Sequence, residues 1–184
     1  MGPFISWEAR KTFEQEGNTV PVSEHVRYHE SAHAVAAERL GVGLEEEAMV
    51  LNSDTDARVN VKNEPCGGED IHDWTIRRLA VKLAGPIARI FQTGEALEWN
   101  TLMYSGEYHT DFETAKTCCF RYLNIPETHA QNPDVDAMMN EAMRVAIECV
   151  RSHKASIAAL KEATANRSSF SRAEVVEVIG QACP

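Results

Sequence analysis

A strong helical periodicity runs from Ser23 to Gly41, and two histidines lie on its apolar face. The residues of this face recur at steps of three and four: Val26, His29, His33, Ala37 and Leu40. Ser23 is a preferred N-cap residue, and Gly41 is a preferred helix terminator. The sequence therefore predicts a helix that turns two imidazoles toward the protein interior, where buried polar groups need partners.

The two histidines belong to an HExxH motif that occupies residues 29–33. Residues four apart on a helix lie one turn above each other, so both imidazoles can reach one tetrahedral metal ion. Glu30 directly follows the first histidine and is placed to take a proton from an attacking water and pass it to a leaving amine. The motif predicts a catalytic divalent ion, with zinc expected. The competing interpretation is a pair of core histidines satisfied by hydrogen bonds.

A catalytic zinc usually has three protein ligands and one open position. The extended form HExxHxxGxxH is absent, because residues 34–39 supply neither the glycine nor the third histidine. The third ligand must therefore come from elsewhere in the chain. Composition does not choose among the candidates, which are Asp70, His72, Asp73, His109 and Asp111.

Four further helices are predicted downstream. One begins after Asp70 or Asp73 and ends near Gly94, one covers about 110–125, one fills most of 133–165, and the last follows Ser171. Pro86 is expected to kink the first of these, because it removes a backbone donor in mid-helix. Ser171 and Glu174 have the spacing of a capping box at the start of the last helix.

Two short apolar runs, 48–51 and 59–61, flank the polar turn 52–56 and predict a β-hairpin. The Glu45–Glu47 run is expected to be a solvated loop. The predicted fold class is therefore α+β, mostly α-helical, with a small β-hairpin. The length of 184 residues favours one domain, which we expect over 22–184 after an irregular N-terminal segment, 1–21.

The charge balance and the cysteines limit the partners and the compartment. With 18 Lys and Arg against 28 Asp and Glu the net charge is −10, and nucleic acid is not an expected partner. No apolar run reaches the roughly 20 residues of a membrane helix, so no membrane span is expected. The five cysteines form no CxxC pair, and the chain shows no readable export signal, which predicts reduced thiols in the cytoplasm. No oligomeric state is predicted.

Several segments resemble the peptidase domain of FtsH-type ATP-dependent zinc proteases. Tyr28–Ala36 resembles the HEAGHA segment of that family, and Val81–Ala88 resembles its LAGRAAE helix. Thr110–Ala115 resembles its (S/N)DLxxAT segment, and Leu160–Val175 is similar to part of the closing helices. The resemblance runs in the same order from about residue 25 to residue 179.

The resemblance implies a zincin-like metallopeptidase domain in which His29, His33 and Asp111 hold the zinc ion and Glu30 is the general base. It also implies that one strand within 48–61 is an exposed edge beside the metal helix. An extended polypeptide substrate would pair with such an edge and present a carbonyl to the site.

The sequence departs from the family pattern at several points. Pro86 and Arg89 stand where the pattern has Arg and Glu, so the packing behind the metal site is expected to differ. No ATPase module precedes His25, and no GxxxxGK[ST] loop occurs, so no ATP partner is expected. The predicted function is a free-standing, ATP-independent zinc endopeptidase acting on unfolded or flexible segments. Two alternatives stay open, a non-catalytic interaction module with the same fold and a regulatory zinc peptidase of another HExxH clan.

Overall fold

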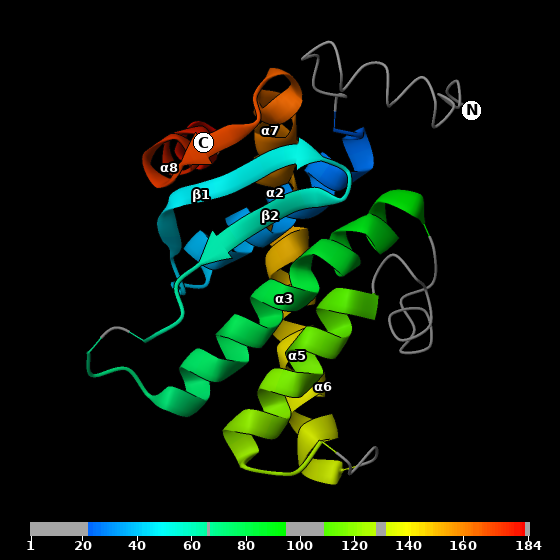
Figure 1. The fold of residues 1–184 in the computed structure, drawn as a ribbon, viewed down its shortest axis with the longest axis vertical. Coiled ribbons are helices and arrows are strands. Elements are labelled where there is room, and N and C mark those ends of the chain that lie inside the picture. The colour runs from blue at the N-terminus through cyan, green and yellow to red at the C-terminus, as the bar shows by residue number, and fades with distance from the viewer. Residues whose placement is uncertain (1–21, 66, 95–108, 128–131, 183–184) are drawn as a thin grey trace.

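The computed structural model describes residues 22–65, 67–94, 109–127 and 132–182, in which helices pack around one small sheet (Figure 1). The helices are α2 (Glu24–Arg39), α3 (Ile71–Thr93), α5 (His109–Leu123), α6 (Pro133–Ser152), α7 (Lys154–Ala163) and α8 (Arg172–Gln181), with a 3-10 turn η1 (Thr164–Asn166). The strands are β1 (Leu44–Ser53), β2 (Asp56–Val61) and β3 (Ser169–Ser171). The predicted class, α+β and mostly helical, is confirmed.

The expected histidine helix is α2, which packs between the sheet and α3 (Figure 1). Ser23 is its N-cap residue, but the Ser23 side chain makes no cap hydrogen bond. Instead the backbone N–H of Ser23 donates to Asp54 Oδ1 at 2.6 Å, and its hydroxyl lies 3.3 Å from His25 Nε2. The start of α2 is therefore tied to the turn between β1 and β2.

The sheet has the strand order β2-β1-β3, and both pairings are antiparallel. The expected hairpin is confirmed, because β1 and β2 pair with Met49 opposite Val59. The Glu45–Glu47 run is solvated, as expected, but it lies within β1 and not in a loop; the register shifts between Leu44 and Met49. β2 forms one edge of the sheet, on the side toward α3 (Figure 1).

Two features differ from the prediction. The segment expected as one helix over 133–165 contains two, because His153, with φ −116° and ψ 24°, leaves the helical conformation between α6 and α7. The second helix then packs against α2. The strand β3 was not predicted; it pairs with β1 so that Phe170 stands opposite Met49, and both side chains are buried.

The longest helix, α3, packs against α2, α5 and α6. Its start is capped by the Asp70 carboxylate, which accepts a hydrogen bond from the N–H of Asp73 at 2.9 Å. It ends at Gly94, whose φ of 74° favours glycine. The helix continues through the buried Pro86. Within the described residues, none of the helices has both the length and the apolar character that crossing a membrane requires.

The described cysteines carry free thiols. Cys119 and Cys149 are buried, and Cys118 is half-buried. Burial raises the pKa of Cys119 to about 12 and that of Cys149 to about 11, so both thiols stay protonated at neutral pH. Cys66, Cys183 and the expected irregular segment 1–21 lie outside the described residues.

The capping box of α8 supports a prediction about stability. The Ser171 hydroxyl accepts from the N–H of Glu174, and the Glu174 carboxylate accepts from the N–H of Ser171 at 2.9 Å. Ser171→Ala is therefore expected to lower the free energy of unfolding by about 1 kcal/mol at neutral pH, as measured by urea denaturation. The exposed Ser168, whose hydroxyl is outside the cap, provides the control; an equal loss for Ser168→Ala would contradict the assignment.

The same cap predicts the direction of a pH dependence. Hydrogen bonds from the Ser171 backbone and from Arg167 lower the pKa of Glu174 from 4.5 to about 2. The folded-state pKa is depressed, so the contribution of Glu174 is complete above pH 4.5 and is lost as the pH falls toward 2. Urea denaturation at a series of pH values between 4.5 and 2 measures this loss of stability.

Candidate metal centre

Two helices bring three potential metal ligands to one place. α2 supplies His29 and His33, one turn apart, and the first turn of α5 supplies Asp111. The side chains are 16%, 8% and 22% exposed, so each is largely withdrawn from water yet reachable from one side. An acid in the first helical turn is also favoured by the helix dipole, which suits Asp111 to its position in α5.

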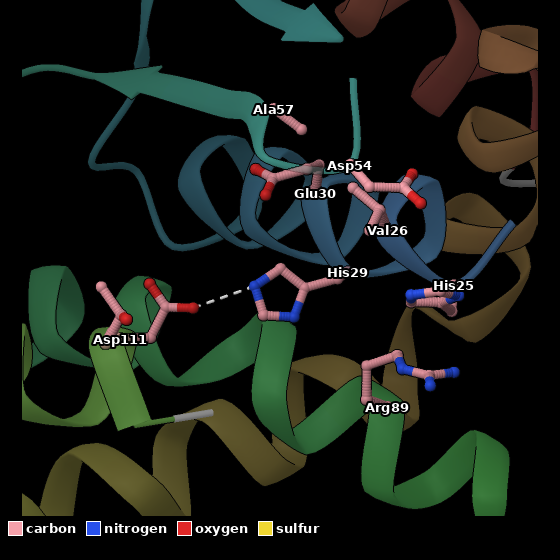
Figure 2. Close-up of a pocket in the computed structure, with 9 residues that line it drawn as sticks. His25, Val26, His29, Glu30, Asp54, Ala57, Arg89 and Asp111 are labelled. Atoms are coloured by element: carbon pink, nitrogen blue, oxygen red, sulfur yellow. Dashed lines mark hydrogen bonds and ion pairs between the residues drawn. The ribbon is translucent and has the colours of Figure 1, made fainter. Parts of the chain in front are cut away.

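The three side chains point their ligand atoms at one another. His29 Nε2 lies 2.9 Å from Asp111 Oδ2, His33 Nε2 lies 3.3 Å from the same oxygen, and the two imidazole nitrogens are 3.0 Å apart. Figure 2 shows Asp111 and His29 facing each other from separate helices. All three ligand atoms fall within 4.8 Å of one another, so the group could hold a metal ion.

A backbone carbonyl of α3 selects the tautomer of His33. His33 Nδ1 is 2.6 Å from the carbonyl oxygen of Val81. Because a carbonyl oxygen only accepts, Nδ1 must carry the proton, and the lone pair of the neutral ring is left on Nε2. This is the usual outer contact of a metal-binding histidine, since it fixes the ring and leaves Nε2 free to coordinate.

The chemistry and the spacing of these donors fit zinc. Two imidazole nitrogens and one carboxylate oxygen are a common ligand set for a catalytic zinc site. In a tetrahedral site with ligands at about 2.0–2.1 Å, neighbouring ligand atoms are about 3.3 Å apart. The separations of 2.9, 3.0 and 3.3 Å are close to that value. Small outward rotations of the side chains would therefore complete the site.

Gly85 of α3 provides the space in which the imidazoles meet. A Cβ atom built on Gly85 would lie 2.6 Å from His29 Nε2, and it would also collide with His33 Nε2. Any larger residue would occupy the position of the ligand atoms. A glycine in mid-helix costs about 1 kcal/mol in helix propensity relative to alanine, so its presence here has a steric reason.

The charges of the group are coupled. Burial by itself lowers the pKa of His33, but the carboxylates of Asp111 and Glu30 outweigh burial and the opposing charge of Lys82, so the pKa of His33 is raised. Burial by itself raises the pKa of Asp111, but the two imidazoles hold it well below its ordinary value. Asp111 is therefore ionised, which is the form that binds a cation.

Among the described residues, the other four candidate third ligands do not join the metal-ligand group. Asp70 caps α3, and Asp73 pairs with Arg77 at 3.3 Å. The ring of His72 lies 5.8 Å from that of Tyr122, and His109 is an exposed residue at the start of α5. Of the five candidates, the structure brings Asp111 to the two histidines, and Asp111 is also the residue that the resemblance implied.

A row of three adjoining pockets passes the candidate metal centre, and we call it the β2 groove. The Arg89 pocket, of about 400 Å³, is lined by His29, Glu30, Ala57, Arg89 and Asp111, among others. The Lys82 pocket, of about 120 Å³, shares Glu30, Ala57 and Asp111 with it and adds His33 and Lys82. The Asn60 pocket, of about 470 Å³, continues along Val59, Asn60 and Val61 and contains Lys82 as well.

Glu30 borders both the Arg89 pocket and the Lys82 pocket, beside the metal-ligand group. It is 9% exposed. Figure 2 shows it on α2 next to His29, with Ala57 of β2 above it. The carboxylate therefore lies where a molecule in the groove would pass the group of ligands.

Several contributors to the site were missed by the sequence analysis. The carbonyl of Val81 leaves no signal in a side-chain pattern, because every residue has one. Gly85 did carry a signal, since a glycine within an apolar helix indicates a close approach of a neighbour. Lys82 and Arg89 occur on the helical face that includes Gly85, but nothing in the local pattern showed that this face borders a groove.

The sequence matches no known protein-family model, and no curated protein matches it.

Gly85→Ala gives a direct test of the metal centre. The added methyl group is expected to push the imidazole rings apart and to lower zinc affinity at least about tenfold, while the gain of about 1 kcal/mol in helix propensity offsets part of the cost of the clash. Competition with a chromogenic chelator measures the affinity, and urea denaturation of the metal-free protein measures the stability. Gly180→Ala in α8 is the matched control, because its Cβ would meet nothing within 4 Å. Unchanged zinc affinity in Gly85→Ala would contradict the centre.

Proposed function

We propose that this chain is a zinc-dependent, ATP-independent endopeptidase of the zincin-like class that cleaves unfolded or flexible polypeptide segments. The observation that carries the proposal is the placement of a two-histidine, one-carboxylate group beside Glu30 in a groove walled by an edge strand. The quoted resemblance to FtsH-type peptidase domains supports the same reaction.

His29, His33 and Asp111 would hold the zinc ion. When bound, zinc supplies a Lewis acid that polarises the substrate carbonyl and favours deprotonation of the attacking water. The protein contributes the fixed orientation of the ligands, through the Val81 carbonyl behind His33 and the space left by Gly85. The ionised Asp111 supplies the negative charge that offsets the cation.

Glu30 would move the proton. Its carboxylate takes a proton from the attacking water, whose oxygen forms the new bond to the carbonyl carbon. The same carboxyl group then donates that proton to the amine nitrogen as the C–N bond breaks. The products are one carboxyl and one amino terminus, and Glu30 ends the reaction in the state in which it began.

The edge strand explains why the substrate should be unfolded. Among the described residues, β2 pairs with β1 on one side and with no strand on the other, so an added strand could hydrogen-bond to its free side. An extended segment that is free of its own secondary structure can form those backbone hydrogen bonds irrespective of its sequence. Such a segment would lie in the β2 groove and pass Glu30. The sequence contains no GxxxxGK[ST] loop, which supports a binding step that does not use ATP.

The compartment is part of the proposal. Free thiols at Cys118, Cys119 and Cys149 suit a reducing environment such as the cytoplasm.

Glu30→Gln tests the proposed general base. The amide keeps the size of the side chain but cannot accept the proton, so cleavage should fall by about 100-fold or more while bound zinc is retained. Hydrolysis of fluorescently labelled casein and elemental analysis of the purified protein measure the two quantities. The exposed Glu148 on α6 offers a matched Glu→Gln control outside the groove. Full activity of Glu30→Gln would refute the mechanism.

Asp111→Ala tests the third ligand. Loss of the carboxylate should weaken zinc binding about 100-fold or more and abolish cleavage, because the ion loses one of three protein contacts. Asp73→Ala is the control, since Asp73 is an acid that the sequence offered as a ligand and the structure places elsewhere. If zinc binds the wild-type chain through Asp111 but no peptide is cleaved, the chain is an interaction module with a structural ion.

A further inference from the structure

One face of α3 carries several positively charged side chains that line the β2 groove. Arg78, Lys82, Gly85 and Arg89 follow at steps of four, three and four, so they share a helical stripe. Arg78 and Lys82 line the Asn60 pocket, Lys82 also lines the Lys82 pocket, and Arg89 lines the Arg89 pocket. Gly85 lies against the two imidazoles. The stripe therefore places cations on both sides of the candidate metal centre.

Lys82 is the cation of this stripe without a partner. It is half-buried, and within the described part of the chain its ammonium group makes no hydrogen bond or ion pair. By contrast, Arg78 donates to Asn63 Oδ1 at 2.6 Å, and Arg89 donates to Gln92 Oε1 at 2.7 Å. A half-withdrawn lysine beside a groove has its strongest interaction with an anion that enters the groove.

The acids around the groove differ in their partners. Asp54 accepts from the N–H of Ser23, and Asp56 pairs with Arg58 at 2.9 Å. Glu45 and Glu47 lie on β1 and border the Asn60 pocket, which Arg78 and Lys82 also line. Glu30 and Asp111 belong to the proposed catalytic group, where a divalent cation would offset their charge.

We propose that the β2 groove selects polypeptide segments that carry an aspartate or glutamate within two residues of the cleaved bond, and that Lys82 binds this carboxylate. The inference rests on the proposed endopeptidase function and names its substrate class. Arg89 extends the same preference to the opposite side of the metal centre. In Figure 2 it lies across His29 from Asp111, together with His25.

The helix geometry sets the limit of two residues. Along the axis of α3, Lys82 precedes Gly85 by about 4.5 Å and Arg89 follows it by about 6 Å, at 1.5 Å per residue. An extended polypeptide advances about 3.3 Å per residue. The two cations therefore stand one to two substrate residues from the point where the chain passes the imidazoles.

Peptide binding provides the first test. Two fluorescein-labelled peptides differ only in carrying Glu or Gln two residues before and after the central bond, and a third carries Lys there. Fluorescence anisotropy with the zinc-loaded Glu30→Gln protein measures their dissociation constants without cleavage. The Glu peptide is expected to bind about tenfold more tightly than the Gln peptide. Raising the salt to about 1 M, where the Debye length is about 3 Å, should weaken this preference only in part, because a half-buried charge pair is screened less than an exposed one.

Variants of Lys82 assign the preference to one side chain. In the Glu30→Gln background, Lys82→Met should reduce the Glu-over-Gln ratio to about twofold or less, and Lys82→Glu should make the Lys peptide the better ligand. A purely structural role for Lys82 would not invert the charge preference. Lys154→Met removes an exposed cation at the start of α7, outside the groove, and should leave the ratio unchanged.

The outcomes separate this inference from the proposed function. The substrate class is overturned if the zinc-loaded Glu30→Gln protein binds the Glu and Gln peptides equally, binds neither, or keeps its preference when Lys82→Met is added. If the peptides show the preference but the wild-type protein cleaves none of them, the selection of acidic segments stands and the endopeptidase proposal fails. If the wild-type protein cleaves the Glu and Gln peptides at equal kcat/KM, the endopeptidase stands and the acidic preference fails.

Discussion

The contact between α2 and α3 at His33 determines the arrangement of the whole site. Two features make up this contact. His33 Nδ1 donates a hydrogen bond to the carbonyl of Val81, and Gly85 has no side chain, which leaves room for the imidazole rings. Protein interiors are close-packed, so two helices in contact cannot shift without changing both. Asp111 arrives on α5, which itself packs against α3. All three potential ligands are therefore positioned relative to a single helix.

Neighbouring residues of α3 have different roles, some in positioning the candidate metal centre and some in lining the groove. Val81 orients a ligand, Lys82 borders the groove, and Gly85 gives the imidazoles room. Pro86 follows directly and has no N–H, so the carbonyl of Lys82 lacks its ordinary donor four residues later. The helix nevertheless continues, because its flanking turns are held by packing against α2, α5 and α6.

What the sequence predicted correctly depends on short-range patterns. The helix with its inward histidines, the hairpin and the capping box at Ser171 follow from residue spacing and from local hydrogen bonding. The break at His153 and the strand β3 were missed, because they depend on contacts with α2 and with β1, more than a hundred residues away along the chain. For the same reason the spacing alone left five third ligands open; the resemblance pointed to Asp111, and the fold brings Asp111 to the two histidines.

The whole chain carries a net negative charge, whereas the α3 stripe in the groove carries positive charge, and this difference determines how an acidic segment would be recognised. The net charge of −10 repels a negatively charged polypeptide at long range, whereas the α3 stripe attracts its carboxylates at contact distance. At physiological ionic strength the Debye length is about 8 Å, so the repulsion is screened outside the groove. The half-buried Lys82 is screened much less, because fewer ions reach it. Selection would therefore act on the bound segment and its dissociation rate, not on the rate of encounter.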